Sequence, residues 1–505
     1  MSRLPLCSLL AAMALFGADS GIWKAAPPPP ASWRRDRIED LSHRRKAVEE
    51  RIGDRAMLLL YAADPRNYAG DVDWPYRQEN DFFYLTGIAQ AGLTLVLLPG
   101  GSGPHEILFL PQADPARETW TGHMLSAAET RQISGIQEVS DSAALPAFLA
   151  AALPRARAFL NPPATDAAKF VVPPLAEIYM LLPERPNPEY TREREFAAKL
   201  GAAGPGVSIQ DATPIFTGLR EIKSPREIDL IQHAIDITAE AFQRGFAAAT
   251  PDAWEYEIQA QFEFTFLRRD GHWGYPCIVG AGRNATTLHY ESNRDRIAAG
   301  DLVLMDDGAE FDGYSADVTR TIPADGRFTR EQAEIYRLVW DAQQAGIGAA
   351  RPGHAMSGTP ESIDSAAGEV LRRGLLKLGL MTDATSTPQF RVWLNHGVSH
   401  PIGLNVHDPG GRELREGMVV TVEPGLYFRT DALDQLPATP ANEKFIAVVR
   451  PAFERYKGIG VRIEDDVLIA AGEPKVLSAA IPSRLEEIEE TIARLRRAPR
   501  IWPLP

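Results

Sequence analysis

The sequence is poor in cysteine, in basic residues and in long apolar runs, and each shortage excludes a class of protein. Cysteine occurs twice in 505 residues, at Cys7 and Cys277, so neither a disulfide framework nor a cysteine-ligated zinc site can form. The 53 basic residues are outnumbered by 67 acidic ones, giving a formal net charge of −14, which argues against nucleic acid as a partner. We therefore expect a soluble globular protein, whose length predicts two domains.

The apolar stretch at the N-terminus has the features of an export signal. Arg3 precedes a mostly apolar run at residues 4–18, and small residues follow it. The run is shorter than the ~20 residues of a membrane-spanning helix, but it matches the core of a signal peptide. We therefore predict a signal peptide over residues 1–20, no stable membrane span, and a periplasmic or extracellular location, with the cytoplasm as the alternative. A proline-rich linker is expected at residues 21–35.

Two regions of different pattern follow the linker. Over residues 36–215, short apolar runs such as Met57–Tyr61 and Ile107–Leu110 alternate with helical segments such as Leu41–Arg51, which predicts an α/β domain with one sheet. Over residues 220–490, pairs of helices precede antiparallel strands, which predicts an α+β domain.

Capping residues locate the helices of the second region. Ser224 followed by Pro225 marks one start, and Thr329 with a glutamine three residues later marks another. Thr250-Pro251 predicts the start of a further helix that ends near Gly271.

The most informative stretch of the second region is an acidic hairpin at Asp301–Pro323. Asp312-Gly313 suits a tight turn between two strands rich in β-branched residues. In that register Asp317 lies opposite Gly308 and diagonal to Asp306, close enough for the two carboxylates to converge. Two ionised carboxylates at that range repel unless one is protonated or a cation lies between them. A bound metal is the economical explanation, and an exposed acidic hairpin is the alternative for the pair taken alone.

Further ligand-type residues interrupt apolar segments downstream. Glu423 breaks an apolar strand before a Pro-Gly turn, and Glu464 shares a strand face with Arg462, for which a structural ion pair is the alternative. A histidine-rich segment precedes them. The combined set of four carboxylates and one imidazole is Asp306, Asp317, His400, Glu423 and Glu464. Hard oxygen ligands with one histidine suit manganese or a similar divalent ion, and four negative charges suffice for two such ions.

These motifs resemble those of a known peptidase superfamily. The matching segments are Leu304-Met-Asp-Asp-Gly to Asp317-Val-Thr-Arg-Thr, His396-Gly-Val-Ser-His400, Val422-Glu-Pro-Gly and Arg462-Ile-Glu-Asp-Asp. They are similar to the metallopeptidases of the pita-bread fold, and among these the chain most resembles aminopeptidase P, the Xaa-Pro aminopeptidases. The resemblance covers nearly the whole chain after the leader. It implies a pita-bread (creatinase/methionine aminopeptidase-like) catalytic domain at the C-terminus, preceded by an α/β N-terminal aminopeptidase P domain.

The resemblance also implies a metal centre and its ligands. Asp306 would chelate one ion, Asp317 and Glu464 would bridge the pair, and His400 with Glu423 would complete the second ion. Glu423 would also be the general base toward a bridging water. Two divalent ions per subunit, most simply Mn²⁺, and a homo-oligomer (dimer or tetramer) are expected.

The remaining site residues surround that centre in the same comparison. Arg462 would restrain the first aspartate and balance its charge. Groups that contact substrate or steady the scissile carbonyl would be His289, His396 and His407, and Tyr427 and Tyr275 would shape the pocket. The neighbours Asp307, Asp465 and Asp466 are expected to be solvated or structural.

The expected activity is hydrolysis of the bond between an N-terminal residue and a proline in second position, on peptide substrates. A prolidase, which cleaves only Xaa-Pro dipeptides, shares the ligand set, and a non-catalytic pita-bread binding protein is the alternative of another class. A dipeptidase needs a cation for the carboxylate beyond the proline. Arg429 and Arg455, which flank the unusually long segment Phe428–Tyr456, are the candidates for that clamp.

Overall fold

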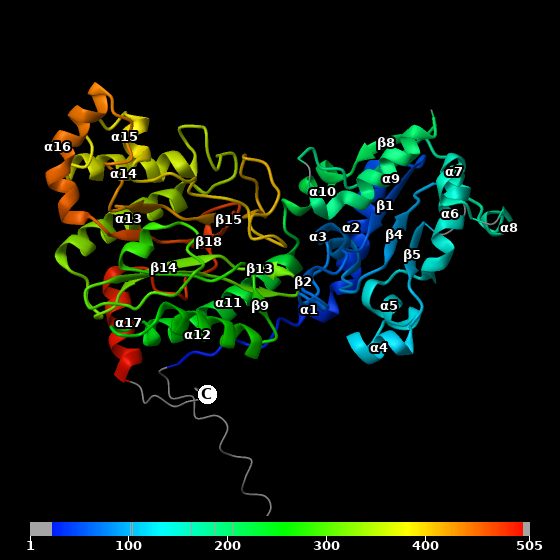
Figure 1. Cartoon of the computed structure of the whole chain (residues 1–505), viewed down its shortest axis with the longest axis horizontal. Helices are drawn as coiled ribbons and strands as arrows, with labels where there is room; N and C mark the ends of the chain where they lie inside the picture. Colours follow the sequence, from blue (N-terminus) through cyan, green and yellow to red (C-terminus); the bar gives the residue numbers. More distant parts are fainter. Residues whose placement is uncertain are drawn as a thin grey trace, which may run out of the picture. The chain divides into compact units, whose positions relative to one another are not determined.

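The computed structural model describes residues 23–100, 103, 105–162, 164–185, 187–204 and 206–497 (Figure 1). The predicted signal peptide lies outside these residues. The described chain forms two compact units, one of residues 31–226 and one that combines residues 227–497 with residues 23–30.

The first unit is built on one mixed sheet in the order β6-β5-β4-β1-β7-β8. Its strands are β1 (Ala56–Tyr61), β4 (Thr94–Leu97), β5 (Glu106–Leu110), β6 (Glu138–Asp141), β7 (Glu177–Met180) and β8 (Ser208–Asp211). Every residue of β1 is buried, because this central strand pairs antiparallel with β4 and parallel with β7. The predicted α/β domain with one main sheet is confirmed.

Helices and a small hairpin complete this unit. The α-helices are α1 (Ser32–Arg35), α2 (Arg37–Ile52), α3 (Asn80–Thr86), α4 (Pro115–Thr121), α5 (Ala127–Ser134), α6 (Leu145–Ala152), α7 (Arg157–Leu160), α8 (Ala164–Ala167), α9 (Thr191–Ala202) and α10 (Thr213–Arg220). The 3₁₀ turns are η1 (Ser142–Ala144), η2 (Pro154–Ala156) and η3 (Pro188–Tyr190), and the hairpin is β2 (Asn67–Ala69) with β3 (Val72–Asp73). Within the described residues no single helix is long and apolar enough to cross a membrane, although the bent pair Ser142–Ala152 and Pro154–Leu160 passes that test by length and composition.

The second unit contains small antiparallel sheets between two groups of helices. The strands are β9 (His272–Trp273), β10 (Ile278–Ala281), β11 (Leu302–Asp307), β12 (Ala309–Phe311), β13 (Tyr314–Ser315), β14 (Val318–Pro323), β15 (Val419–Val422), β16 (Gly425–Tyr427), β17 (Gly460–Arg462), β18 (Asp465–Leu468) and β19 (Lys475–Val476), with η4 (Gly282–Thr286) after β10. They pair in the orders β10-β11-β14, β13-β12-β9, β15-β18-β19 and β16-β17.

Two groups of helices enclose these strands. The helices are α11 (Pro225–Ala248), α12 (Glu255–Arg268), α13 (Arg330–Ala349), α14 (Ile363–Lys377), α15 (Thr387–Arg391), α16 (Pro440–Tyr456) and α17 (Leu485–Arg497). Figure 1 shows α11, α12 and α17 on one side of the strands and α13 and α14 on the other. This arrangement buries strands on both faces, which is why β11, β14 and β15 are buried along their whole length.

The capping signals located two of the three predicted helix starts. Helix α11 begins at Pro225, and α13 begins after a capping box between Thr329 and Gln332. The predicted start at Thr250-Pro251 was wrong, because α12 begins at Glu255. Asp252 has a φ of +72°, a left-handed conformation that cannot continue a helix.

The acidic hairpin has the predicted register. Phe311 pairs with Tyr314 across the Asp312-Gly313 turn, and both turn residues have positive φ, +48° and +84°, as a type I′ turn requires. Farther along, Asp306 pairs with Thr319. This register brings Asp306 and Asp317 to the same end of the β11–β14 ladder.

Part of the predicted linker is attached to the second unit. The backbone N–H of Lys24 donates to Oε1 of Gln243 at 2.9 Å, and that of Ala26 donates to Oε2 of Glu240 at 2.8 Å. Both acceptors lie on α11. Residues 24–26 are therefore bound to a helix, within the segment that the sequence predicted to be an extended linker.

Candidate active site

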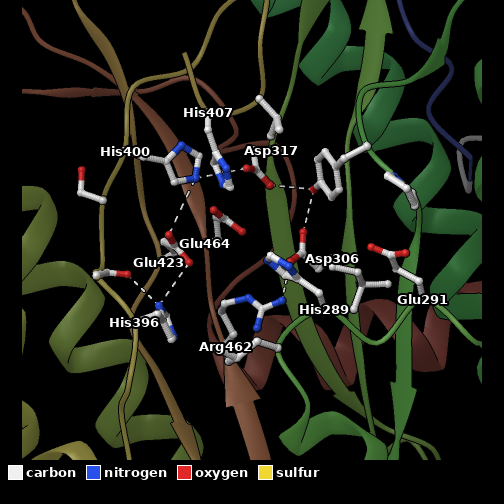
Figure 2. Close-up of a pocket in the computed structure, with 17 residues that line it drawn as sticks. His289, Glu291, Asp306, Asp317, His396, His400, His407, Glu423, Arg462 and Glu464 are labelled. Atoms are coloured by element: carbon white, nitrogen blue, oxygen red, sulfur yellow. Dashed lines mark hydrogen bonds and ion pairs between the residues drawn. The ribbon is translucent and has the colours of Figure 1, made fainter. Parts of the chain in front are cut away.

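A cavity of about 390 Å³ in the second unit gathers most of the residues that the sequence analysis selected (Figure 2). The selected residues in its wall are Tyr275, His289, Asp306, Asp317, His396, His400, His407, Glu423, Arg462 and Glu464. Tyr427 is the selected residue that lies outside this lining, although its hydroxyl contacts two residues of the wall. The wall also contains residues that were not selected: Pro276, Ile278, Leu288, Glu291, Gly397, Ser399 and Val406.

Strand ends supply the carboxylates. Asp306 lies near the end of β11 and Asp317 directly precedes β14. Glu423 follows β15, and Glu464 lies between β17 and β18. The backbone N–H of Glu464 donates to the carbonyl of Thr319 at 3.1 Å, so the two halves of the site are joined by main-chain hydrogen bonding.

Asp306 and Asp317 converge on one hydroxyl group. The Tyr275 hydroxyl oxygen lies 2.6 Å from Oδ1 of Asp306 and 2.6 Å from Oδ1 of Asp317. A phenol carries one proton and can donate to one of them only. The guanidinium of Arg462 contacts the other oxygen of Asp306. A cation between the carboxylates would satisfy both, so this geometry fits a metal.

His400 presents one nitrogen to the carboxylates. Its Nδ1 lies 3.1 Å from the carbonyl oxygen of Pro401, which fixes a proton there, while Nε2 lies 3.4 Å from Asp317 and 3.7 Å from Glu423. A ligand nitrogen whose partner nitrogen donates to a carbonyl is typical of metal-binding histidines. Ligand atoms of Asp317, His400 and Glu464 all lie within 4.8 Å of one another, which is close enough to hold a metal ion.

The pKa values of these groups also indicate a site that binds positive charge. Burial raises the pKa of Glu423 to about 8 against the opposing charges of His400 and Arg462. Burial and the neighbouring carboxylate of Asp317 raise the pKa of Glu464 well above its usual value. Burial alone would lower the pKa of His400, but Asp317 and Glu423 raise it to about 9. The site therefore attracts positive charge, which protons or metal ions can supply.

A second set of hydrogen bonds ties His396 to the first aspartate. Nδ1 of His396 lies 2.6 Å from the carbonyl oxygen of Gly397, and its Nε2 lies 2.9 Å from the Tyr427 hydroxyl. Arg462 Nη1 donates to that hydroxyl at 3.0 Å. Burial first, and then the charge of Arg462, lower the pKa of His396 to about 4. His396 is therefore neutral at physiological pH, with Nε2 accepting from Tyr427.

His289 and His407 lie at the exposed part of the cavity wall. The ring of His407 stands edge-on to that of His400, with centroids 4.3 Å apart. Burial and the charge of His400 lower the pKa of His407. Both exposed histidines can reach a ligand that enters from solvent.

None of the three neighbouring aspartates is solvated. Asp307 and Asp466 are fully buried and Asp465 is 3% exposed. Asp466 accepts the backbone N–H of Asp317 at 3.0 Å, and Asp465 forms an ion pair of 2.6 Å with Arg320. The solvated alternative is excluded for all three.

Comparisons with known proteins agree with this geometry. Residues 229–471 match the model of metallopeptidase family M24, and residues 41–160 match that of the aminopeptidase P N-terminal domain. The Xaa-Pro aminopeptidase of Haemophilus influenzae is 34% identical over 465 residues, covering 89% of this chain and 96% of that protein. The chain belongs to the aminopeptidase P family.

Other relatives of this aminopeptidase P-family chain cover nearly its full length. The Xaa-Pro aminopeptidase of Escherichia coli is 31% identical over 492 residues, covering 91% of this chain and 98% of that protein. The solved structure of an Escherichia coli aminopeptidase P variant in complex with substrate matches with a TM-score of 0.77 at 29% identity, covering 91% and 99% of the two chains. The predicted fold is confirmed: an N-terminal α/β aminopeptidase P domain followed by a pita-bread catalytic domain.

The candidate clamp arginines of this aminopeptidase P-family chain lie outside the cavity wall. Arg429 pairs with Asp431 at 3.2 Å, and Arg455 pairs with Glu334 at 3.3 Å. The segment that they flank forms α16 and the loop before it. Neither arginine therefore lies in a position to bind a ligand in the cavity.

Thr319, which contacts two of the selected residues, and Glu291, in the cavity wall, were not selected from the sequence. Thr319 Oγ1 donates to Glu464 Oε2 at 2.6 Å and accepts from Arg462 Nε at 3.0 Å. Its position opposite Asp306 followed from the predicted hairpin register, so it could have been found. Glu291 lies on an irregular segment after η4, where no strand or helix period indicates which side chains face a cavity.

Proposed function

We propose that this chain is a dimetal aminopeptidase that removes the N-terminal residue from peptides of three or more residues with proline in second position. The observation that carries the proposal is one cavity that brings together all five predicted ligands, Asp306, Asp317, His400, Glu423 and Glu464, in a chain of the aminopeptidase P family. A non-catalytic binding role would not require the complete set.

The ligand set supports two divalent ions, most simply Mn²⁺. Asp306, Asp317, His400, Glu423 and Glu464 would hold them, because the four buried carboxylates of this set repel one another without cations. Bound ions of this kind acidify water and stabilise the negative charge that develops on a carbonyl oxygen.

Glu423 is placed to move the proton of the attacking water. Burial raises its pKa to about 8, and its carboxylate lies 3.7 Å from His400 and 3.6 Å from His396. A base with a pKa near the working pH takes up and returns a proton most effectively. His396, held neutral by burial and the charge of Arg462, would orient that carboxylate.

The exposed histidines would act on the peptide itself. His289 and His407 line the open part of the cavity and can donate hydrogen bonds to a carbonyl oxygen or deliver a proton to the leaving nitrogen. The nitrogen of an Xaa-Pro bond carries no hydrogen, so a site that offers it no acceptor can favour proline over other residues.

The distribution of arginines favours a peptide over a dipeptide. Among the described residues that line the cavity, Arg462 is the one arginine, and it is engaged with Asp306, Thr319 and Tyr427. A dipeptidase must bind the carboxylate directly after the proline, for which a free guanidinium is the usual partner.

The test compares Ala-Pro with Ala-Pro-Ala as substrates of the Mn²⁺-loaded protein. We expect a higher kcat/KM for the tripeptide, with alanine released from its N-terminus. A higher kcat/KM for Ala-Pro would make the protein a prolidase, which shares the ligand set. Absence of cleavage of both peptides, in protein shown to contain two metal ions per chain, would contradict both activities.

A further inference from the structure

The segment that carries His289 and Glu291 is fastened to the fold by a buried carboxylate. Glu255, at the start of α12, is fully buried. Its Oε1 accepts from the backbone N–H of Ala281 at 2.8 Å, and its Oε2 accepts from the Tyr290 hydroxyl at 2.9 Å and the backbone N–H of Asp295 at 2.8 Å. Tyr290 separates the two cavity residues, so its hydrogen bond fixes the backbone between them.

Asn293 fastens the other end of the same segment. It is fully buried with a φ of +47°. Its Oδ1 accepts from the backbone N–H of Val279 at 3.0 Å, and its Nδ2 donates to the carbonyl of Cys277 at 2.9 Å. Strand β10 and Cys277 just before it therefore hold the oxygen and the nitrogen of the Asn293 side chain. The residues between Tyr290 and Asn293 have little freedom as a result, and Glu291 occupies a fixed position at the cavity wall.

Glu291 brings an exposed negative charge to that wall. Its side chain is exposed and lines the cavity, and no ion pair or hydrogen bond joins it to another residue in the described part of the chain. The same cavity wall contains the apolar residues Pro276, Ile278 and Leu288. Apolar residues and a carboxylate in one cavity wall suit a long side chain with a methylene stem and a cationic tip.

An arginine lies just outside the opposite side of the cavity. Figure 2 shows Glu291 and His396 on opposite sides of the cavity. Beside His396, the exposed Arg391 donates to the His396 carbonyl oxygen at 3.3 Å. A peptide carries its positive end at the N-terminus and its negative end at the C-terminus. Electrostatic complementarity therefore favours the first residue, which carries the N-terminal ammonium, on the Glu291 flank.

We propose that Glu291 is a specificity-determining residue that favours peptides with lysine or arginine as the first residue. The proposal rests on the proposed Xaa-Pro aminopeptidase function and names a substrate class within it. The stem of the first side chain packs on Pro276, Ile278 and Leu288, and its cationic tip pairs with the Glu291 carboxylate.

The test uses two peptides that differ by one charged group. Lys-Pro-Ala and norleucine-Pro-Ala share the methylene stem and the N-terminal ammonium, so their ratio of kcat/KM isolates the side-chain ammonium. An exposed ion pair favours its partner by about two- to fivefold, and we expect that preference for Lys-Pro-Ala in the native protein. Glu291→Gln should bring the ratio to about one, and Glu291→Lys should invert it. Raising the ionic strength should shrink the native preference.

A matched control separates this contact from the general charge of the protein. Glu416 is exposed in the same unit and does not line the cavity, so Glu416→Gln should leave the ratio unchanged. A ratio near one in the native protein, or a ratio that Glu291→Gln does not change, would overturn the proposal. If Glu291→Gln lowers kcat/KM equally for both peptides, Glu291 binds the N-terminal ammonium and not the side chain of the first residue.

The results distinguish a wrong role for Glu291 from the absence of aminopeptidase activity. Cleavage of norleucine-Pro-Ala with no lysine preference refutes the role of Glu291 and leaves the aminopeptidase function intact. If neither peptide is cleaved, calorimetric binding of the same two peptides to the Mn²⁺-loaded protein gives the same ratio without turnover. Tighter binding of Lys-Pro-Ala that Glu291→Gln removes supports the proposal, and equal binding overturns it.

Discussion

Replacing Arg462 with methionine tests how the site balances its buried charge. Arg462 is 3% exposed. Its guanidinium contacts Asp306 and donates to Thr319 at 3.0 Å and to the Tyr427 hydroxyl at 3.0 Å. Arg462→Met keeps much of the buried stem but leaves Asp306 without its cationic partner. Removing one partner of a buried ion pair costs roughly 3–5 kcal/mol, and we expect a loss of that size in metal-free protein.

Metal ions should recover part of this loss. If Asp306 is a ligand, bound Mn²⁺ supplies the charge that the variant lacks, and binding to the folded state adds stability. The assay is the free energy of unfolding of the second unit in urea, with chelator and with Mn²⁺. The difference between native protein and Arg462→Met should be clearly smaller with Mn²⁺ than with chelator.

Arg244 provides the matched control. It is 4% exposed in the same unit and pairs with Glu240 at 3.4 Å, a carboxylate outside the cavity wall. Arg244→Met should also destabilise the protein, but its loss should be the same with and without Mn²⁺. Equal metal responses of the two variants would refute the role of Asp306 as a ligand.

Three further predictions concern the metal and the N-terminus. Chelation should abolish activity, and Mn²⁺ should restore it best. Asp317→Ala or Glu464→Ala should be inactive even with Mn²⁺. Full turnover in protein verified as metal-free would contradict this prediction. The pKa values of Glu423 and His400 are raised to about 8 and about 9, so both groups carry protons at lower pH and a metal ion must displace these protons to bind. Metal affinity should therefore rise with pH until both groups are deprotonated. A metal affinity that calorimetry finds independent of pH would exclude this competition between protons and metal. We also propose export, so mass spectrometry of the native protein should find a chain starting near residues 19–26, and an intact Met1 in a cytoplasmic fraction would refute it.

Local chemistry made the centre of the site predictable. The Asp312-Gly313 turn determined the hairpin register, and the two-residue period of a strand then put Asp306 and Asp317 on converging positions. A charged residue inside an apolar strand, such as Glu423, is costly without a partner, so its place in the sequence is itself a sign of a functional site. The same hairpin register also predicts that Thr319 lies opposite Asp306.

Other features depend on contacts between distant segments. Glu291 reaches the cavity because Glu255 and Asn293 fasten an irregular segment to the fold around β10, and no local period encodes that arrangement. The start of α12 was misplaced because Asp252 adopts positive φ, which a Thr-Pro pair does not reveal. Arg429 and Arg455 were candidates because they flank the unusually long segment Phe428–Tyr456, but each pairs with a carboxylate outside the cavity.

Hydrolysis of the bond before a proline in second position is the activity that we propose for this cavity. The most direct measurement incubates the Mn²⁺-loaded protein with Ala-Pro-Ala and with Ala-Ala-Ala and identifies the products by mass. The account predicts free alanine and Pro-Ala from the first peptide, an intact second peptide, and no products from either with Asp317→Ala. Comparable cleavage of both peptides, or release of products by the Asp317 variant, would contradict it.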